Sequence, residues 1–227
     1  MKNVVGERGR RWLERVVRVL LGLGFAMAAG AYFRNSYAAW QGAHAQGLDH
    51  VGLAHALSSL AVAFYTALMA GVYAVRHDPI NKFAGLFPTV AAFLGGFLMV
   101  ALLFLDPRDD LSLGAQMTAF ALVLTGNVAS LIVLSQLGRS FSILPEGRKL
   151  VTHGIYAYVR HPLYVAEAIG TSGIVILFFS PAALGLFAAQ LGWQFVRMHY
   201  EEKVLRETFP SYEAYARRTK RLLPGVY

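Results

Sequence analysis

The sequence predicts an all-α, polytopic membrane protein, from its composition and from the spacing of its apolar runs. Of the 227 residues, 56% are hydrophobic and only 15% are charged, whereas a soluble domain carries roughly 25% charged residues. Six apolar runs each approach the ~20 residues with which a helix crosses a bilayer. They lie at about 16–33, 52–75, 87–105, 113–137, 163–179 and 182–199. Cysteine is absent, which excludes disulfides, thiolate metal sites and cysteine nucleophiles.

The first apolar run follows a basic N-terminus, an arrangement that a signal peptide would also show. The run continues through Phe33 without a clear small-residue cleavage site, so we expect a first membrane helix. The weakly polar residues 34–51 include Tyr37 and Trp40. Such rings settle at headgroup level, so we expect an interfacial segment on the outer face.

The next three runs consist mainly of small and aliphatic residues, among which Gly95 and Gly96 would allow close helix packing. The fifth and sixth runs are separated only by a short turn at Ser180-Pro181, so we expect a tight hairpin. A charged helical segment then extends to Phe209. Pro210 ends it, and Ser211 could cap a last short helix at 212–218.

The distribution of Lys and Arg predicts the orientation. With the N-terminus inside, nineteen of the 21 cationic residues fall on inner segments, and only Arg34 and Arg108 fall on outer loops. This bias predicts that both termini face the cytoplasm. We expect the protein to lie in an inner or plasma membrane. The formal charge of +8 then reflects topology and anionic lipid headgroups. It gives no reason to expect nucleic acid as a partner.

The interval 138–164 is polar and broken between two apolar regions, and it suggests a division at residue 137. A four-helix membrane region would span 1–137, and a catalytic region would span 138–227. The interval contains two His, three Tyr and four cations, Arg139, Arg148, Lys149 and Arg160, and Gly and Pro residues interrupt it repeatedly. A connecting loop at a membrane surface could look similar, but this mixture favours a site that faces the cytoplasm.

Three acidic residues are candidates for chemistry. Glu167 lies about one turn into the fifth helix, where a carboxylate is costly unless it faces a cavity or a partner. An interhelical hydrogen bond near the interface would also explain it. Arg197 and Glu201 share a helix face at i and i+4, and Glu202 follows. A surface salt bridge could account for that pair alone.

Together with the 138–164 interval, these residues could surround a ligand that carries charges of both signs. An onium group would also be attracted to aromatic faces. S-adenosylmethionine fits this description, and so does a phospholipid headgroup. The seven His residues show no pair with the helix-face spacing and nearby carboxylates of zinc enzymes, so no metal site is expected.

Several motifs in residues 138–221 resemble the isoprenylcysteine carboxyl methyltransferase family, within a superfamily that includes phospholipid methyltransferases. They are Gly154-Ile-Tyr156, Arg160-His161-Pro162-Leu-Tyr164, the helical hairpin, Arg197, Glu201-Glu202, Phe209 and Tyr212-x-x-Tyr215. The combination is typical of the superfamily rather than of one substrate. The first four helices carry no diagnostic motif.

The resemblance implies S-adenosylmethionine as cofactor in a cytosol-facing pocket. It implies cofactor-binding roles for Gly154, Tyr156, Arg160, His161, Pro162, Tyr164, Glu201 and Glu202. Arg197 would orient an acceptor carboxylate or hydroxyl, and the catalytic candidates are Arg197, Glu201 and Glu167. The acceptor would be a lipophilic small molecule or lipid that enters from the bilayer, with carboxylate O-methylation the activity most like the family. Nothing in the sequence indicates the oligomeric state.

Glu167 departs from the resemblance, which implies a small residue at this position. The departure puts a prenylcysteine carboxylate substrate in doubt, because Glu167 could act as a base for an amine or hydroxyl acceptor. Two other readings stay open for the whole chain. One is a membrane reductase that uses NADPH, and the other is a non-catalytic accessory or transport component.

Overall fold

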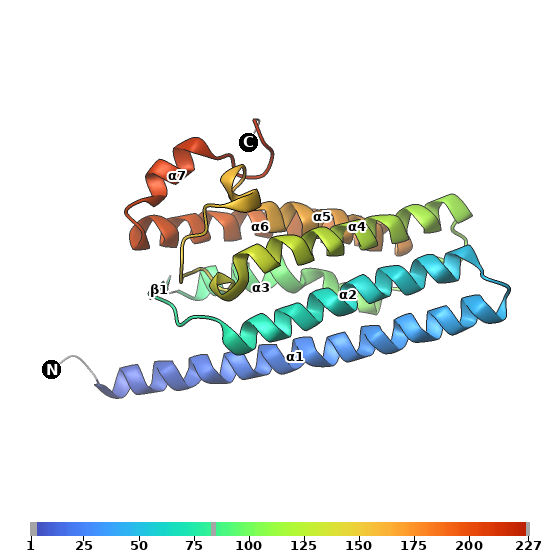
Figure 1. Cartoon of the computed structure of the whole chain (residues 1–227), viewed down its shortest axis with the longest axis horizontal. Coiled ribbons are helices and arrows are strands. Elements are labelled where there is room, and N and C mark those ends of the chain that lie inside the picture. The colour runs from blue at the N-terminus through green and yellow to red at the C-terminus, as the bar shows by residue number, and fades with distance from the viewer. Residues whose placement is uncertain (1–3, 83–84, 226–227) are drawn as a thin grey trace.

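The computed structural model describes residues 4–82 and 85–225, without the side chains at 4–11, 13, 14, 82 and 103. The described chain is all-α apart from one pair of two-residue strands (Figure 1). Lys2 lies outside the described residues. The predicted fold class is therefore confirmed at the level of all-α architecture.

The main helices are α1 (Val4–Ala45), α2 (His50–Val75), α3 (Leu86–Phe97), α4 (Leu113–Leu137), α5 (Pro162–Leu177) and α6 (Pro181–Thr208). A 3₁₀ segment, η1 (Leu98–Phe104), continues α3. Three stretches are long and apolar enough to cross a membrane, Arg15–Ala45, His50–Val75 and Leu113–Ser140. Leu86–Leu102 and Pro162–Leu177 are shorter apolar helices.

The end of the first membrane helix, expected at about residue 33, was placed too early, because α1 continues as a helix to Ala45. Alanines in this stretch favour the helix. The turn comes only at Gly47 and Leu48, which both have positive φ. Asp49 then caps α2, and its carboxylate accepts hydrogen bonds from the backbone N–H groups of Val51 at 3.3 Å and Gly52 at 2.8 Å.

The helices lie side by side, with α1 against α2 at one edge of the bundle (Figure 1). Next, α4 packs along α5, and α3 packs along α6. A side chain at Gly126 in α4 would collide with the backbone of Gly170 in α5. A Cβ at Gly95 in α3 would lie 3.3 Å from the α6 backbone at Trp193, so this glycine allows the close packing expected of it.

The α5–α6 connection is short, as expected. Ser180 caps α6 by accepting a hydrogen bond from the backbone N–H of Ala183 at 3.2 Å, and Pro181 occupies the first turn, where it needs no donor. The two helices nevertheless pack mainly on other neighbours, α5 on α4 and α6 on α3.

The remaining small elements lie at the end of the bundle where α1 begins (Figure 1). They are β1 (Asn81–Lys82), η2 (Gly138–Ser140), β2 (Glu146–Gly147), η3 (Gly154–Ala157) and α7 (Tyr212–Arg218). Strands β1 and β2 pair antiparallel. Ser211 precedes α7 as expected, but its side chain makes no capping hydrogen bond.

A hydrophobic core joins this end layer to the bundle. Its buried members include Tyr73 from α2, Leu134 from α4, Phe141 and Tyr156 from the connecting stretch, and Leu163 from α5. The polar interval between α4 and α5 is therefore packed onto the helices rather than hanging from them as a free loop.

Candidate active site

A cavity of about 120 Å³, part of it open to solvent, lies where the α4–α5 connection meets the start of α5 and the second half of α6. The polar and aromatic residues that line it are Ser140, Ser142, Glu146, Lys149, Tyr156, Arg160, His161, Tyr164, Glu167, Arg197, Glu201, Tyr212 and Tyr215. Phe141 and several Leu and Val side chains complete the lining.

Most of the site residues predicted from the sequence meet in this cavity. Those that line it are Tyr156, Arg160, His161, Tyr164, Glu167, Arg197 and Glu201. Gly154, Pro162 and Glu202 are not among the lining residues. The predicted site residues are therefore of two kinds. Some face the cavity, and the others lie behind its lining.

Arg197, Glu201 and Tyr164 form one connected group on the cavity wall. The Arg197 Nε donates to Glu201 Oε1 at 3.0 Å, and the Tyr164 hydroxyl donates to the same oxygen at 2.8 Å. The Arg197 guanidinium also lies over the Tyr164 ring, 5.1 Å from its centre. A second Arg197 nitrogen donates to the Ser142 carbonyl at 3.4 Å. These contacts hold the Glu201 carboxylate in place, with its side chain 20% exposed.

Glu167 has neutral partners instead. The Tyr65 hydroxyl donates to Glu167 Oε1 at 2.9 Å, and the Gln194 amide lies 3.5 Å from Oε2. Tyr65 comes from α2, 102 residues away along the chain. Within residues 4–82 and 85–225, no cationic group lies within ion-pair distance of Glu167.

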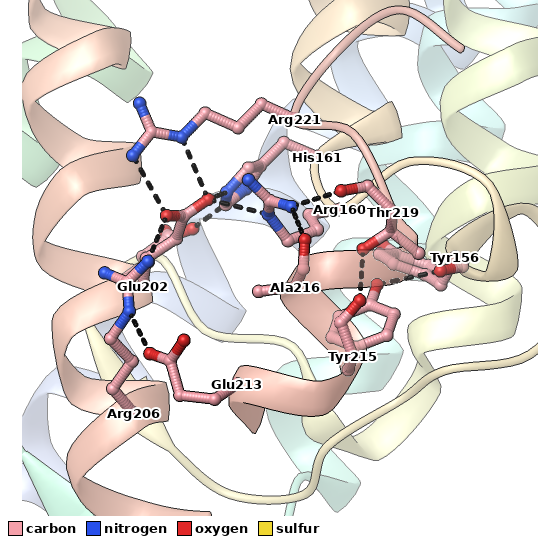
Figure 2. Close-up of polar contacts among 11 residues, drawn as sticks. Tyr156, Arg160, His161, Glu202, Arg206, Glu213, Tyr215, Ala216, Thr219 and Arg221 are labelled. Carbon is pink, nitrogen blue, oxygen red and sulfur yellow. Dashed lines mark hydrogen bonds and ion pairs between the residues drawn. The ribbon is translucent and has the colours of Figure 1, made fainter. Parts of the chain in front are cut away.

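Glu202, the neighbour of Glu201, is fully buried and is surrounded by cationic side chains (Figure 2). Oε1 accepts from Arg160 Nε at 2.9 Å and lies 3.2 Å from His161 Nε2. Oε2 accepts from Arg221 at 3.0 Å and from Arg206 at 3.3 Å. Burial raises the pKa of Glu202, but the hydrogen bonds and charges of these partners outweigh it and hold the pKa well below its ordinary value.

The same cluster attaches the C-terminal segment to the start of α5. Arg160 donates to the carbonyls of Ala216, at 2.8 Å, and of Thr219 (Figure 2). The backbone N–H groups of Arg160 and His161 donate to the carbonyls of Lys220 and Arg221 at 2.8 and 2.9 Å. We call Glu202 with Arg160, His161, Arg206 and Arg221 the Glu202 cluster.

Three tyrosines close another side of the cavity. The Tyr215 hydroxyl donates to the Tyr156 carbonyl at 2.8 Å (Figure 2), and the Tyr212 and Tyr215 rings meet edge to face. Burial raises the pKa of Tyr215 to about 12 and raises the pKa values of Tyr156 and Tyr212 as well. All three therefore stay neutral at physiological pH and offer aromatic faces. Tyr212 and Tyr215, which belong to the motif found in the sequence, therefore line the cavity.

Gly154 and Pro162 shape the backbone around the cavity. Gly154 has a φ of +62°, and a side chain there would collide with Gln136 of α4. The oxygen of the same Gln136 amide accepts from the Ile155 N–H at 2.9 Å. Pro162 starts α5 at a position that needs no N–H donor.

A buried ion pair supports the connecting stretch beneath Arg197. Arg148 donates to Glu146 Oε2 at 2.6 Å, and the Ser142 hydroxyl donates to the same oxygen at 2.6 Å. Because Ser142 also offers its carbonyl to Arg197, this pair helps to place the Arg197 guanidinium. In the part of the chain that the structure describes, no group of three or more potential metal ligands was found.

Sequence reasoning missed Tyr65, Gln194 and Arg221 as parts of the site. Tyr65 is one of two tyrosines in an apolar helix, and Gln194 lies within the sixth apolar run, so neither was singled out. Arg221 contributed only to the charge count that predicted topology. A search for polar residues on otherwise apolar helices would have drawn attention to Gln194.

Residues 118–207, from within α4 to the last turn of α6, match the model of the isoprenylcysteine carboxyl methyltransferase (ICMT) family. The chain is 32% identical over 113 residues to protein-S-isoprenylcysteine O-methyltransferase B of Arabidopsis thaliana, covering 46% of this chain and 57% of that protein. It is 34% identical over 119 residues to protein-S-isoprenylcysteine O-methyltransferase of Schizosaccharomyces pombe, covering 49% and 50%.

The chain is also similar to the cobalt-zinc-cadmium resistance protein CzcN of Cupriavidus metallidurans, with 32% identity over 134 residues, 57% of this chain and 60% of that protein. The chain thus spans between half and three fifths of the length of these curated relatives. The matched residues include those that build the start of α5, the Arg197–Glu201 wall and Glu202. The resemblance read from the sequence is confirmed, because the segment that builds most of the cavity is similar to the ICMT family.

Proposed function

We propose that this protein transfers a methyl group from S-adenosylmethionine to a lipophilic acceptor at the membrane. The observation that carries the proposal is one cavity that is lined by His161 and Tyr164 from the middle of the ICMT-like segment and by Arg197 and Glu201 from near its C-terminal end. Carboxylate O-methylation is the version of this activity most like the named relatives.

The lining chemistry fits S-adenosylmethionine, a ligand with an ammonium, a carboxylate, a ribose and a sulfonium. Glu201 offers a carboxylate for an amine or hydroxyl, and Lys149 and Arg160 offer cations for a carboxylate. The faces of Tyr156 and Tyr164 suit a base or an onium group. When bound, the cofactor supplies a methyl group on a positively charged sulfur.

The residues of the chain would mainly bind, orient and exclude water. We propose that His161, Tyr164, Tyr156, Arg160 and Glu201 contact the cofactor. Gly154, Pro162 and Glu202 would act indirectly, by setting the backbone and holding Arg160 and His161. Alignment of the acceptor with the methyl group in a dry pocket supplies most of the rate acceleration in such a transfer.

The acceptor side would be formed by the apolar part of the lining, which includes Leu137, Phe141, Leu144 and Leu163. Apolar helices flank this wall, so a lipophilic acceptor would enter from the bilayer while the cofactor enters from the cytoplasm. Arg197 would orient the reacting head group. On this proposal residues 138–227 carry most of the catalytic residues, and residues 1–137 form the membrane support.

We propose six membrane segments with both termini in the cytoplasm of an inner or plasma membrane. The basis is the asymmetry of Lys and Arg together with the location of both described chain ends at the same end of the bundle (Figure 1). The natural absence of cysteine makes a direct test simple. Arg217→Cys should react with an impermeant maleimide only in inverted vesicles, and Asp109→Cys only in right-side-out vesicles. The reverse pattern would overturn the orientation.

Binding of S-adenosylhomocysteine to detergent-purified protein tests the function most directly. Calorimetry should detect micromolar binding that Glu201→Gln weakens. Glu207→Gln is the matched control, because it changes an exposed glutamate six residues later on the same helix. If the folded protein binds no S-adenosylhomocysteine, the proposal is wrong. Binding of NADPH instead would favour a membrane reductase, and binding of neither would favour a non-catalytic membrane component.

A further inference from the structure

Three carboxylates near the cavity differ in how their charge is balanced. Glu202 contacts three arginines and a histidine, and Glu201 contacts Arg197. Glu167 lines the same cavity, yet within the described residues it has no cation within 4.0 Å. A partly buried carboxylate with no cation in direct contact suits a positively charged ligand or a proton.

The partners of Glu167 fix the position of its carboxylate but leave the carboxylate able to accept further hydrogen bonds. Tyr65 donates one hydrogen bond at 2.9 Å, and the buried Gln194 amide lies 3.5 Å away. A carboxylate has about four acceptor positions, so two neutral donors leave capacity for a third group in the cavity. The contacts come from α2 and α6, while Glu167 itself stands on α5, so three helices hold the carboxylate.

A base is required only for some methyl acceptors. An acceptor carboxylate is already deprotonated at neutral pH and attacks without giving up a proton. A hydroxyl or an amine carries a proton on the attacking atom, and its transfer to a positioned base accelerates the reaction. An unpaired carboxylate beside the reacting group would also repel an acceptor carboxylate.

Resting on the proposed methyl transfer, we propose that Glu167 is a catalytic base and that the acceptor carries its attacking atom as an O–H or N–H group, not as a carboxylate. In the step, the lone pair of the acceptor oxygen or nitrogen forms the bond to the methyl carbon. The carbon–sulfur bond breaks and its electron pair goes to sulfur, which becomes a neutral thioether. The acceptor proton goes to Glu167, and water later removes it.

Tyr65 is a positioning residue in this proposal, because it acts through Glu167. Its hydroxyl stabilises the charged carboxylate and aims it into the cavity. The ionisable groups of the neighbouring elements that face Glu167 are Tyr65, Tyr156, Tyr164, Arg197 and Glu201. Without Tyr65, the acid limb of the pH–rate profile should move to higher pH.

Three probes with one farnesyl tail test the acceptor class. They are farnesylamine, farnesol and N-acetyl-S-farnesylcysteine, each incubated with the full-length protein in detergent and methyl-labelled S-adenosylmethionine. We expect label on the amine or the alcohol, and the two distinguish nitrogen from oxygen acceptors. Methylation of the prenylcysteine alone would overturn the proposal.

If none of the three probes is labelled, membranes from cells that express the protein decide the question. Methyl esters release methanol in base, whereas methyl ethers and methylamines do not. Label that survives base supports the proposal. Label released by base, or no incorporation by a protein that binds S-adenosylhomocysteine, counts against it. Failure to bind S-adenosylhomocysteine is the separate result that defeats the methyl transfer itself.

Two variants then test the assigned residues. Glu167→Gln should lower turnover by about 10²–10⁴-fold, with unchanged melting temperature and unchanged affinity for S-adenosylhomocysteine. Tyr65→Phe should lower turnover by roughly tenfold and shift the pH profile. Tyr32→Phe, which removes the hydroxyl of an exposed tyrosine on α1, is the matched control and should change neither. Unchanged turnover in Glu167→Gln would overturn the assignment.

Discussion

Glu201 and Glu202 are neighbours in the sequence but belong to two different regions of the molecule. Glu201 faces the cavity, with one arginine, one tyrosine hydroxyl and a side chain that is 20% exposed. Glu202 faces the C-terminal segment, is fully buried and contacts three arginines and a histidine (Figure 2). Two adjacent carboxylates on one helix thus differ in their exposure to solvent and in the number of basic side chains that they contact.

The difference follows from helix geometry. Successive side chains on an α-helix point about 100° apart, so α6 presents Glu201 and Glu202 to different neighbours. The first can meet a ligand, and the second holds Arg160 and His161, which themselves line the cavity. We infer that the Glu-Glu pair of the motif combines a binding residue with a structural residue, and the following predictions test this division.

The largest effect should come from Glu202→Gln. The change removes the carboxylate charge that Arg160 and Arg221 contact, and one of the two carboxylate partners of Arg206. Breaking a buried pair costs about 3–5 kcal/mol. We expect a lower free energy of unfolding, seen as a large drop in melting temperature and in yield from detergent. Glu202→Gln protein that melts like the wild type would show that the cluster does not stabilise the fold.

Glu201→Gln should show the opposite profile. Loss of the charge removes a charge-assisted hydrogen bond to a bound ligand, worth about 1.5–3 kcal/mol. Affinity for S-adenosylhomocysteine should therefore fall by about 10–100-fold, measured by calorimetry, while the melting temperature stays close to that of wild type. If the variant lost stability and kept affinity, the roles of the two acids would have to be exchanged.

Acid should act mainly through Glu202. Its pKa is lower in the folded protein than its ordinary value of 4.5, so the stabilisation is complete above about pH 4.5 and is lost as the pH falls towards the folded-state pKa. Melting temperatures measured from pH 6 downwards should therefore fall more steeply for wild type than for Glu202→Gln. Parallel curves for the two proteins would exclude Glu202 as the titrating group.

Much of the fold could be predicted from the sequence, because apolar runs of suitable length identify the helices. The end of α1 could not be predicted in this way. Residues 34–45 are weakly polar, which suggests a connection, and yet they are rich in alanine, which favours a helix. The sequence also does not show whether Glu201 or Glu202 faces the cavity. That choice depends on the rotation of α6 against α3, which packing such as that at Gly95 determines.

The site could be predicted only where its residues are close in sequence. The Arg160-His161-Pro162-Leu-Tyr164 segment and the Arg197–Glu202 segment identified two walls of the cavity. The contact of Tyr65 with Glu167 joins residues 102 positions apart, and neither the tyrosine nor its apolar surroundings indicate a partner. Long-range polar contacts of this kind arise from tertiary packing, which local patterns do not encode.

The smallest effect is expected from Arg221→Met, which tests whether the C-terminal segment belongs to the Glu202 cluster. Arg221 donates to Glu202 at 3.2 and 3.0 Å, and its side chain is 29% exposed. Its loss should cost about 1 kcal/mol, because Arg160, His161 and Arg206 still balance the carboxylate. Arg218→Met is the control, since within the described part of the chain this exposed arginine donates only to a carbonyl of its own helix. A larger loss of melting temperature in Arg221→Met than in Arg218→Met would support the attachment. Equal losses would mean that the backbone hydrogen bonds of Lys220 and Arg221 to residues 158–161 hold the segment without the side chain.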